Sequence, residues 1–153
     1  MPLFNMSELR ARLGRRQRLI GLDPGRKTVG VALSDVELRL ASPYGTLARG
    51  KLADNAASIL AIARREDAGG LVVGLPLTMD GAVGPAAQAA RDWALALSAA
   101  TGLPAALWDE RLTTEAAERF LIGQADLSRR RRAQVIDRVA AAAILQAALD
   151  ASG

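Results

Sequence analysis

The chain has 153 residues, which suits one domain, and half of its residues are hydrophobic, which favours a packed core over disorder. It contains no cysteine and no histidine, which excludes disulfides, thiolate metal sites and every mechanism that needs an imidazole. The net charge of +4 suits a nucleic-acid partner and an ordinary soluble protein equally well.

Residues 1–17 precede the first predicted strand, and we expect them to be an N-terminal extension of a domain that spans residues 18–153. The segment is rich in arginine and slightly amphipathic. A transit peptide and a short surface helix from Ser7 to Leu13 both explain this pattern, and we favour the helix. No apolar run approaches the roughly 20 residues that span a bilayer, so we expect a cytoplasmic protein without a membrane partner.

Three strands are predicted to come first. Residues 18–23 are apolar on both faces, as in a central strand. Pro24-Gly25 is a turn signal, so that residues 28–34 return beside the first strand as a hairpin. A third strand is expected over residues 38–47, where Pro43 indicates a sheet edge or a bulge.

Helices and strands then alternate. Apolar spacing and turn residues predict helices over residues 52–66, 85–100, 113–121 and about 126–150. Short buried strands are predicted over residues 71–75 and 105–109. Gly69 and Gly70 are expected to end the first of these helices. This order predicts an α/β protein in which helices cover a mixed sheet.

Three carboxylates stand at the ends of these elements. Asp23 ends the first strand, with an extended backbone because proline follows it. Glu110, beside Asp109, follows the last strand, at the sheet edge where open α/β sheets bind ligands. Asp137 lies near the apolar stripe of the last helix, where an unpaired carboxylate is costly to bury.

Each acid alone also has an ordinary structural explanation. Asp23 suits the first position of a Pro-Gly turn, and Glu110 suits the entry to a polar loop. Asp137 can form an ion pair with Arg130 or Arg138. If the three acids converge, their carboxylates repel one another, and a bound hard cation such as Mg²⁺ or Mn²⁺ would offset that repulsion. Such a site hydrolyses phosphodiesters without any histidine.

Four motifs spread over most of the chain carry a family resemblance. They are GLDPGRKTVGVALSD (21–35), VVGLPLTMDG (72–81), DERLTT (109–114) and DRVAAAAILQ (137–146). Together they resemble the YqgF/RuvX family, described as Holliday-junction-resolvase-like proteins or pre-16S rRNA nucleases. The resemblance implies a ribonuclease H-like fold related to RuvC resolvases, with a mixed five-stranded sheet and helices on both faces. It also implies a metal-dependent nuclease whose catalytic, metal-binding acids are Asp23, Glu110 and Asp137, with Asp109 as the alternative to Glu110.

The substrate implied by the resemblance is RNA, including precursor rRNA and ribosomal particles, or branched DNA. The last helix offers Asp137 alone, with Ala140 and Ala141 one turn later, whereas RuvC-type resolvases bring a fourth acid. This departure favours RNA processing in ribosome biogenesis over resolution of Holliday junctions. A resolvase needs two sites in a symmetric dimer, and the sequence leaves a monomer and a homodimer equally open.

Several basic and hydroxyl residues are candidates for contacts with phosphates. They are Arg26, Lys27, Arg111, Thr113, Thr114, Arg129, Arg130, Arg131 and Arg132. The two threonines stand at the N-terminus of the helix predicted over residues 113–121, and a helix N-terminus attracts anions. The arginines at 129–132 oppose the positive end of their helix dipole, and bound phosphate would offset that. Solvated cations and simple helix capping explain the same residues.

Two alternatives to a nuclease stay open. The Asp-x-Gly at residues 23–25, followed by a hairpin, also begins ATP-binding proteins of the actin and sugar-kinase type, although these usually duplicate the domain. A non-catalytic nucleic-acid-binding module of ribosome assembly would merely retain the acids. The segment 74–77 either lets a nucleic-acid backbone approach or is an ordinary strand exit.

Overall fold

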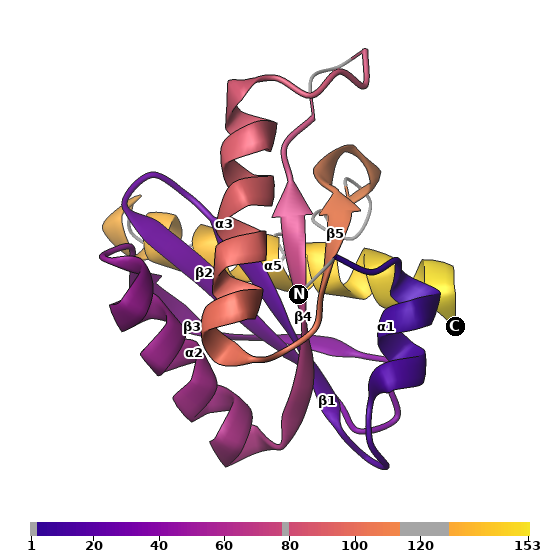
Figure 1. Cartoon of the computed structure of the whole chain (residues 1–153). Helices are drawn as coiled ribbons and strands as arrows, with labels where there is room; N and C mark the ends of the chain where they lie inside the picture. Colours follow the sequence, from indigo (N-terminus) through magenta and orange to yellow (C-terminus); the bar gives the residue numbers. More distant parts are fainter. Residues whose placement is uncertain (1–2, 78–79, 114–128) are drawn as a thin grey trace.

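A five-stranded sheet in the order β3-β2-β1-β4-β5 forms the middle layer of the protein (Figure 1). The computed structural model describes residues 3–77, 80–113 and 129–153, and for residues 113 and 129–137 it describes the backbone alone. The strands are β1 (Arg18–Pro24), β2 (Thr28–Ser34), β3 (Ala41–Ala48), β4 (Ala68–Leu75) and β5 (Ala105–Asp109). β1, β2 and β3 form an antiparallel meander, whereas β4 and β5 add in parallel to β1.

Helices cover both faces of this sheet (Figure 1). They are α1 (Met6–Arg12), α2 (Leu52–Glu66), α3 (Pro85–Thr101), the 3-10 helix η1 (Glu110–Thr113) and α5 (Arg129–Ser152). α2 and α3 bury one core cluster against the sheet, and α1 and α5 bury a second on the opposite face. The predicted mixed five-stranded sheet between two helical layers is therefore confirmed. No helix in the described part of the chain is both long and apolar enough to cross a membrane.

The side chains of β1 alternate between the two cores. Ile20 and Leu22 belong to the core beneath α2 and α3, and Leu19 belongs to the core beneath α5. Gly21 lets α5 lie directly on the strand, because a Cβ on Gly21 would stand only 2.8 Å from the Cβ of Leu145. By the same alternation, Asp23 is on the α5 side of the sheet.

The N-terminal segment packs onto the α5 face of the sheet. The backbone N–H of Phe4 donates to the carbonyl of Ala105 at 2.9 Å, beside β5. α1 begins at a reciprocal capping box and buries Met6 and Leu9. The helix expected over residues 7–13 is observed over Met6–Arg12.

The third strand begins three residues later than predicted. Asp35 accepts hydrogen bonds from the backbone N–H groups of Arg39 and Leu40, and this local turn competes with strand pairing. The interpretation of Pro43 is confirmed. β3 is an edge strand, and its pairing with β2 shifts register near Pro43.

The prediction for Gly69 and Gly70 was wrong. α2 ends at Glu66, and Asp67 takes the left-handed conformation that terminates the helix. β4 starts at once at Ala68, because parallel pairing with β1 extends to Arg18. The two glycines therefore lie inside the strand. Most of the helix expected over residues 113–121 falls outside the described residues, while residues 110–113 form η1.

Candidate active site

The carboxyl groups of Asp23 and Glu110 meet beyond the ends of β1 and β5. Burial of Glu110, its hydrogen bond with Asp23 and the negative charges of Asp23 and Asp109 raise the pKa of Glu110 to about 8. In the absence of a cation, this carboxyl stays protonated near neutral pH and donates a hydrogen bond to Asp23. Two acids that share one proton form a site at which positive charge would be stabilised.

Gly74 is the residue that lets the two acids meet. Leu22 of β1 pairs with Val73 of β4, so Asp23 and Gly74 come next on the two adjacent strands. A Cβ on Gly74 would lie 2.6 Å from Oε1 of Glu110 and 2.6 Å from Cδ1 of Ile144. Glu110 therefore crosses β4 over the bare backbone of Gly74. The sequence did not predict this role, because it follows from the order of the strands.

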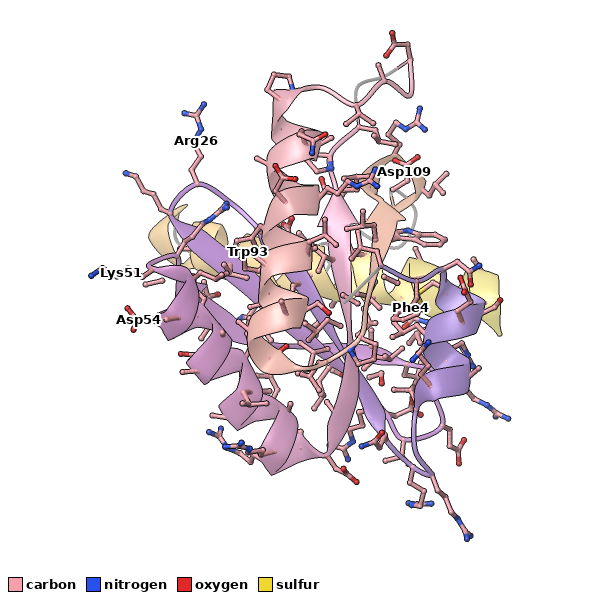
Figure 2. The ribbon with its side chains drawn as sticks, viewed as in Figure 1. Phe4, Arg26, Lys51, Asp54, Trp93 and Asp109 are labelled. Atoms are coloured by element: carbon pink, nitrogen blue, oxygen red, sulfur yellow. The ribbon has the colours of Figure 1, made fainter. Side chains whose placement is uncertain are left out.

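Asp109 is part of a different set of contacts, although it is adjacent to Glu110. Its Oδ2 accepts from Nη2 of Arg111 at 2.6 Å, and its Oδ1 accepts from the backbone N–H of Arg111 at 3.0 Å. The hydrogen bonds from Arg111 hold the pKa of Asp109 below its usual value. Asp109 therefore binds Arg111 at the end of β5 (Figure 2), whereas Glu110 forms a hydrogen bond with Asp23.

The side chain of Asp137 lies outside the described residues, although the backbone of α5 includes its position. The carbonyl of Ala141 stands 3.0 Å from the position that a Cβ on Gly21 would take, so this part of α5 lies over β1. Position 137 is one helical turn before Ala141. Among the described residues, no group of three or more acids is placed to hold a metal ion.

Arg26 and Lys27 lie in the turn between β1 and β2, directly after Asp23. The N–H of Gly25 donates to the carbonyl of Thr28 at 2.8 Å and closes the turn. Figure 2 shows Arg26 pointing outward from the turn into solvent. Both side chains are exposed, and the two residues come three and four positions after Asp23 in the chain.

Arg49 is a residue of this region that the sequence did not single out. Its Nη1 donates to the carbonyl of Gly25 at 2.7 Å, and its backbone N–H donates to the carbonyl of Lys27 at 2.8 Å. Its guanidinium lies 5.6 Å from the ring centroid of Trp93 on α3. Arg49 thus fixes the turn that follows Asp23. No local sequence signal links residues this far apart.

The other predicted phosphate contacts have different outcomes. Arg111 is paired with Asp109, as described above, with about a third of its side chain exposed. The remaining residues, or their side chains, lie outside the described part of the structure: Thr113, Thr114, Arg129, Arg130, Arg131 and Arg132.

The residues that the structure brings together suit a hard divalent cation. Both Asp23 and Glu110 offer carboxylate oxygens, the ligands that Mg²⁺ and Mn²⁺ prefer. Burial and the nearby negative charges of Asp23 and Asp109 raise the pKa of Glu110, and a cation bound between the two acids would oppose both effects. A bound cation would therefore favour the ionised form of Glu110.

Solved structures share this architecture. T. thermophilus RuvC in complex with a Holliday junction substrate superposes with a TM-score of 0.57 at 18% identity, covering 88% of this chain and 94% of that chain. The yeast mitochondrial Holliday junction resolvase Ydc2 gives a TM-score of 0.54 at 11% identity, covering 94% and 83%. These likenesses show the fold, which is ribonuclease H-like as predicted.

Sequence relatives cover almost the whole chain. A protein of Gluconacetobacter diazotrophicus named "Putative pre-16S rRNA nuclease" is 64% identical over 99% of both chains. A protein of the same name from Gluconobacter oxydans is 59% identical over 99% of this chain and 95% of its own. The model of the RuvX family, described as Holliday junction resolvase, matches residues 17–151. The predicted resemblance is confirmed, and the chain belongs to the RuvX family.

Proposed function

We propose that this protein is a divalent-metal-dependent nuclease that hydrolyses phosphodiester bonds in structured RNA. The observation that carries the proposal is the pairing of Asp23 at the end of β1 with Glu110 after β5, where burial and this pairing raise the pKa of Glu110 to about 8. This arrangement needs a cation and no histidine, in agreement with the composition. The nuclease names of the relatives support the reaction class.

Asp23 and Glu110 are proposed as the catalytic acids that would hold Mg²⁺ or Mn²⁺. Asp137 is proposed as the third acid, because α5 lies over β1 one turn after position 137. A bound ion would lower the pKa of a water molecule and offset negative charge on the phosphate. Asp109 is a weaker candidate, since Arg111 holds its carboxylate.

The protein's own residues would bind the metal ion and hold the phosphates of the substrate in place. Glu110 must release its proton before both acids can act as anionic ligands, and the solvent receives it. Arg26 and Lys27 are proposed to hold a substrate phosphate beside Asp23, while Arg49 keeps their turn in place. Arg111 would offer its exposed edge to the substrate. Further phosphate contacts are proposed for Thr113, Thr114, Arg129, Arg130, Arg131 and Arg132.

Precursor 16S rRNA, in a ribosomal particle of the cytoplasm, is the proposed substrate, on the names of the relatives. Resolution of Holliday junctions is the second candidate, on the family description and the RuvC-like fold. The chemistry is the same in both cases. A resolvase requires two sites in a symmetric dimer, so the oligomeric state in solution separates the two candidates.

The decisive experiment titrates Mg²⁺ and Mn²⁺ against a precursor rRNA fragment, an unrelated RNA hairpin and a four-way DNA junction. The wild type is compared with Asp23→Asn and Asp137→Asn, and Asp54→Asn on the exposed start of α2 serves as the charge-matched control. We expect metal-dependent cleavage by the wild type and by Asp54→Asn, and no cleavage by Asp23→Asn or Asp137→Asn. Equal cleavage by wild type and Asp23→Asn would place the activity elsewhere, and no cleavage of any substrate would refute a nuclease.

A further inference from the structure

The whole net positive charge of the chain resides in its first 18 residues. This segment contains five arginines and one glutamate, whereas residues 19–153 contain equal numbers of basic and acidic side chains. The segment is attached to the domain, because Phe4 bridges to β5 and both Met6 and Leu9 are buried. Its charge is therefore presented on a fixed surface, which suits a polyanionic ligand.

Three of these five arginines line a cleft where β1 begins and α2 ends, which we call the basic cleft. Its volume is about 510 Å³, and its lining residues are Arg15, Arg16, Arg18, Val36, Arg65, Glu66 and Asp67. Parallel pairing of Arg18 with Ala68 brings the N-terminal segment beside the end of α2. In Figure 1 this is the lower end of the sheet, whereas β4 and β5 point upward towards the candidate active site.

A tight turn presents two of the arginines. The N–H of Gln17 donates to the carbonyl of Gly14 at 3.2 Å, and Oε1 of Gln17 accepts from the N–H of Gly14 at 2.7 Å. Arg15 and Arg16 lie between these residues with exposed side chains. Arg16 has φ of 62°, in the left-handed region that favours glycine or asparagine. Local folding therefore gives no reason for an arginine at this position.

The charges of the basic cleft are incompletely neutralised. Within the described residues, Arg18 is the only one of its four arginines with a carboxylate within 4 Å, Glu66 at 3.8 Å. The Nε of Arg18 is buried and lacks a hydrogen-bond partner. Arg65 donates to the hydroxyl of Tyr44 and suits the negative end of the α2 dipole. Neither the dipole nor an ion pair accounts for Arg15 and Arg16.

We propose that the basic cleft is a second binding site for the phosphodiester backbone of the RNA substrate, on the opposite end of the sheet from Asp23. The identity of the ligand as RNA rests on the proposed function, whereas the preference for phosphate rests on the arginines. Arg18 and Asp23 are separated by the length of β1, about 17 Å at about 3.3 Å per residue. A folded RNA longer than a short stem can therefore contact both sites and be held in register for cleavage.

Two variants test the proposal. Arg15→Gln with Arg16→Gln removes two charges from the cleft and alters no contact of the core. Arg16→Asn removes one charge and places a residue suited to the left-handed conformation, so thermal stability should be unchanged or higher. Arg39→Gln with Arg91→Gln is the matched control, since both side chains are exposed and neither lines the cleft.

Binding of precursor rRNA is measured by fluorescence anisotropy at several salt concentrations, without divalent metal, so that no cleavage is needed. For Arg15→Gln with Arg16→Gln we expect affinity to fall about tenfold or more and the slope of log K against log[salt] to become shallower by about 1.4 to 1.8. Arg16→Asn should give about half that change in slope. A short RNA stem that cannot span both sites should bind the wild type more weakly than the longer RNA does.

Slopes that match those of the wild type and the Arg39/Arg91 control would overturn the proposal. Inorganic phosphate provides the second arm. If phosphate stabilises the wild type but not the cleft variant, while RNA binds both equally, the cleft takes a small anion and the RNA assignment is wrong. Failure of the nuclease proposal appears separately, as wild-type protein that binds RNA in this assay and cleaves nothing when metal is added.

Discussion

Asp109 and Glu110 are consecutive residues whose carboxyl groups belong to two separate networks. Asp109 is held by the guanidinium of Arg111 at 2.6 Å, and Glu110 shares a proton with Asp23. The change from strand to 3-10 helix between these residues turns their side chains in different directions. Of these two adjacent acids, Glu110 is therefore the one that forms a hydrogen bond with Asp23.

The two acids are expected to respond differently to amide substitution. Glu110→Gln should lower kcat on the order of a hundredfold or more, because a proposed ligand of the metal that stabilises the transition state is lost. The kcat of Asp109→Asn should stay within about tenfold of the wild-type value, since the ion pair that is lost, between Asp109 and Arg111, contributes little free energy. Steady-state cleavage of one RNA substrate by both variants is the measurement. Equal losses would mean that Asp109 also contacts the metal.

Gly74→Ala is expected to reduce activity while leaving the fold intact. The new Cβ would meet Oε1 of Glu110 and Cδ1 of Ile144, and both are ends of flexible side chains that can move. The unfolding free energy should therefore fall by about 1 kcal/mol, the low end of the cost of overpacking. Displacing Glu110 by about 1 Å should lower kcat by tenfold to a hundredfold.

Gly45→Ala on β3 is the matched control for this substitution. A Cβ on Gly45 would meet nothing within 4 Å, so both activity and stability should be preserved. The two proteins are compared by thermal unfolding and by metal-dependent cleavage. Wild-type kcat in Gly74→Ala would show that the position of Glu110 is not set by the space above Gly74.

Much of the fold follows from local patterns in the sequence. The first hairpin and the edge strand with Pro43 have strong turn and backbone signals, and the structure confirms both elements. The turn itself lies later than predicted, because Pro24 still pairs with Val29 and the turn closes between Gly25 and Thr28. The start of β4 was misplaced, because glycine usually breaks a helix whereas here pairing with Arg18 decides the strand's extent. Long-range pairing overrode a local preference.

The site is less accessible to sequence reasoning than the fold. Asp23 and Glu110 could be selected as acids at strand ends, and the family resemblance singled them out further. Gly74 and Arg49 could not, because each acts on residues that are distant in the chain. The convergence of Asp137 with the two other acids stays a prediction.

The stability of the metal-free protein should fall as the pH rises from about 5 to about 8. The pKa of Glu110 is raised from 4.5 to about 8, so the folded protein retains a proton in this window that the unfolded chain has released. The stability that this proton contributes is complete below about pH 4.5 and is lost as the pH rises through about 8. The pKa values of Asp35 and Asp109 are lowered, so the stability that these two residues contribute changes only at lower pH.

Mg²⁺ should reverse this dependence, because the cation replaces the proton between the two acids. The increase in Tm on adding Mg²⁺ is expected to be small near pH 5 and larger near pH 8. Glu110→Gln cannot titrate at this position, so its Tm should vary less over the same range and respond weakly to Mg²⁺. A wild-type increase that is the same at both pH values would contradict a shared site for proton and metal.

Gly21→Ala is expected to destabilise the protein, in contrast to Gly74→Ala. The added Cβ would stand 2.8 Å from the Cβ of Leu145 and 3.0 Å from the carbonyl oxygen of Ala141, so α5 itself would have to move. Overpacking of this kind lowers the unfolding free energy by about 1–3 kcal/mol. Tm should therefore fall by about 2–4 °C for each kcal/mol.

The same shift of α5 should lower activity in Gly21→Ala, because this helix carries the proposed third acid, Asp137. Gly74→Ala should lose activity with a smaller fall in Tm than Gly21→Ala, and Gly45→Ala should keep both. Measuring Tm and kcat for the three proteins under one set of conditions therefore distinguishes displacement of Glu110 from displacement of α5. A Gly21→Ala protein with wild-type Tm would show that α5 does not press on β1 as closely as the 2.8 Å separation requires.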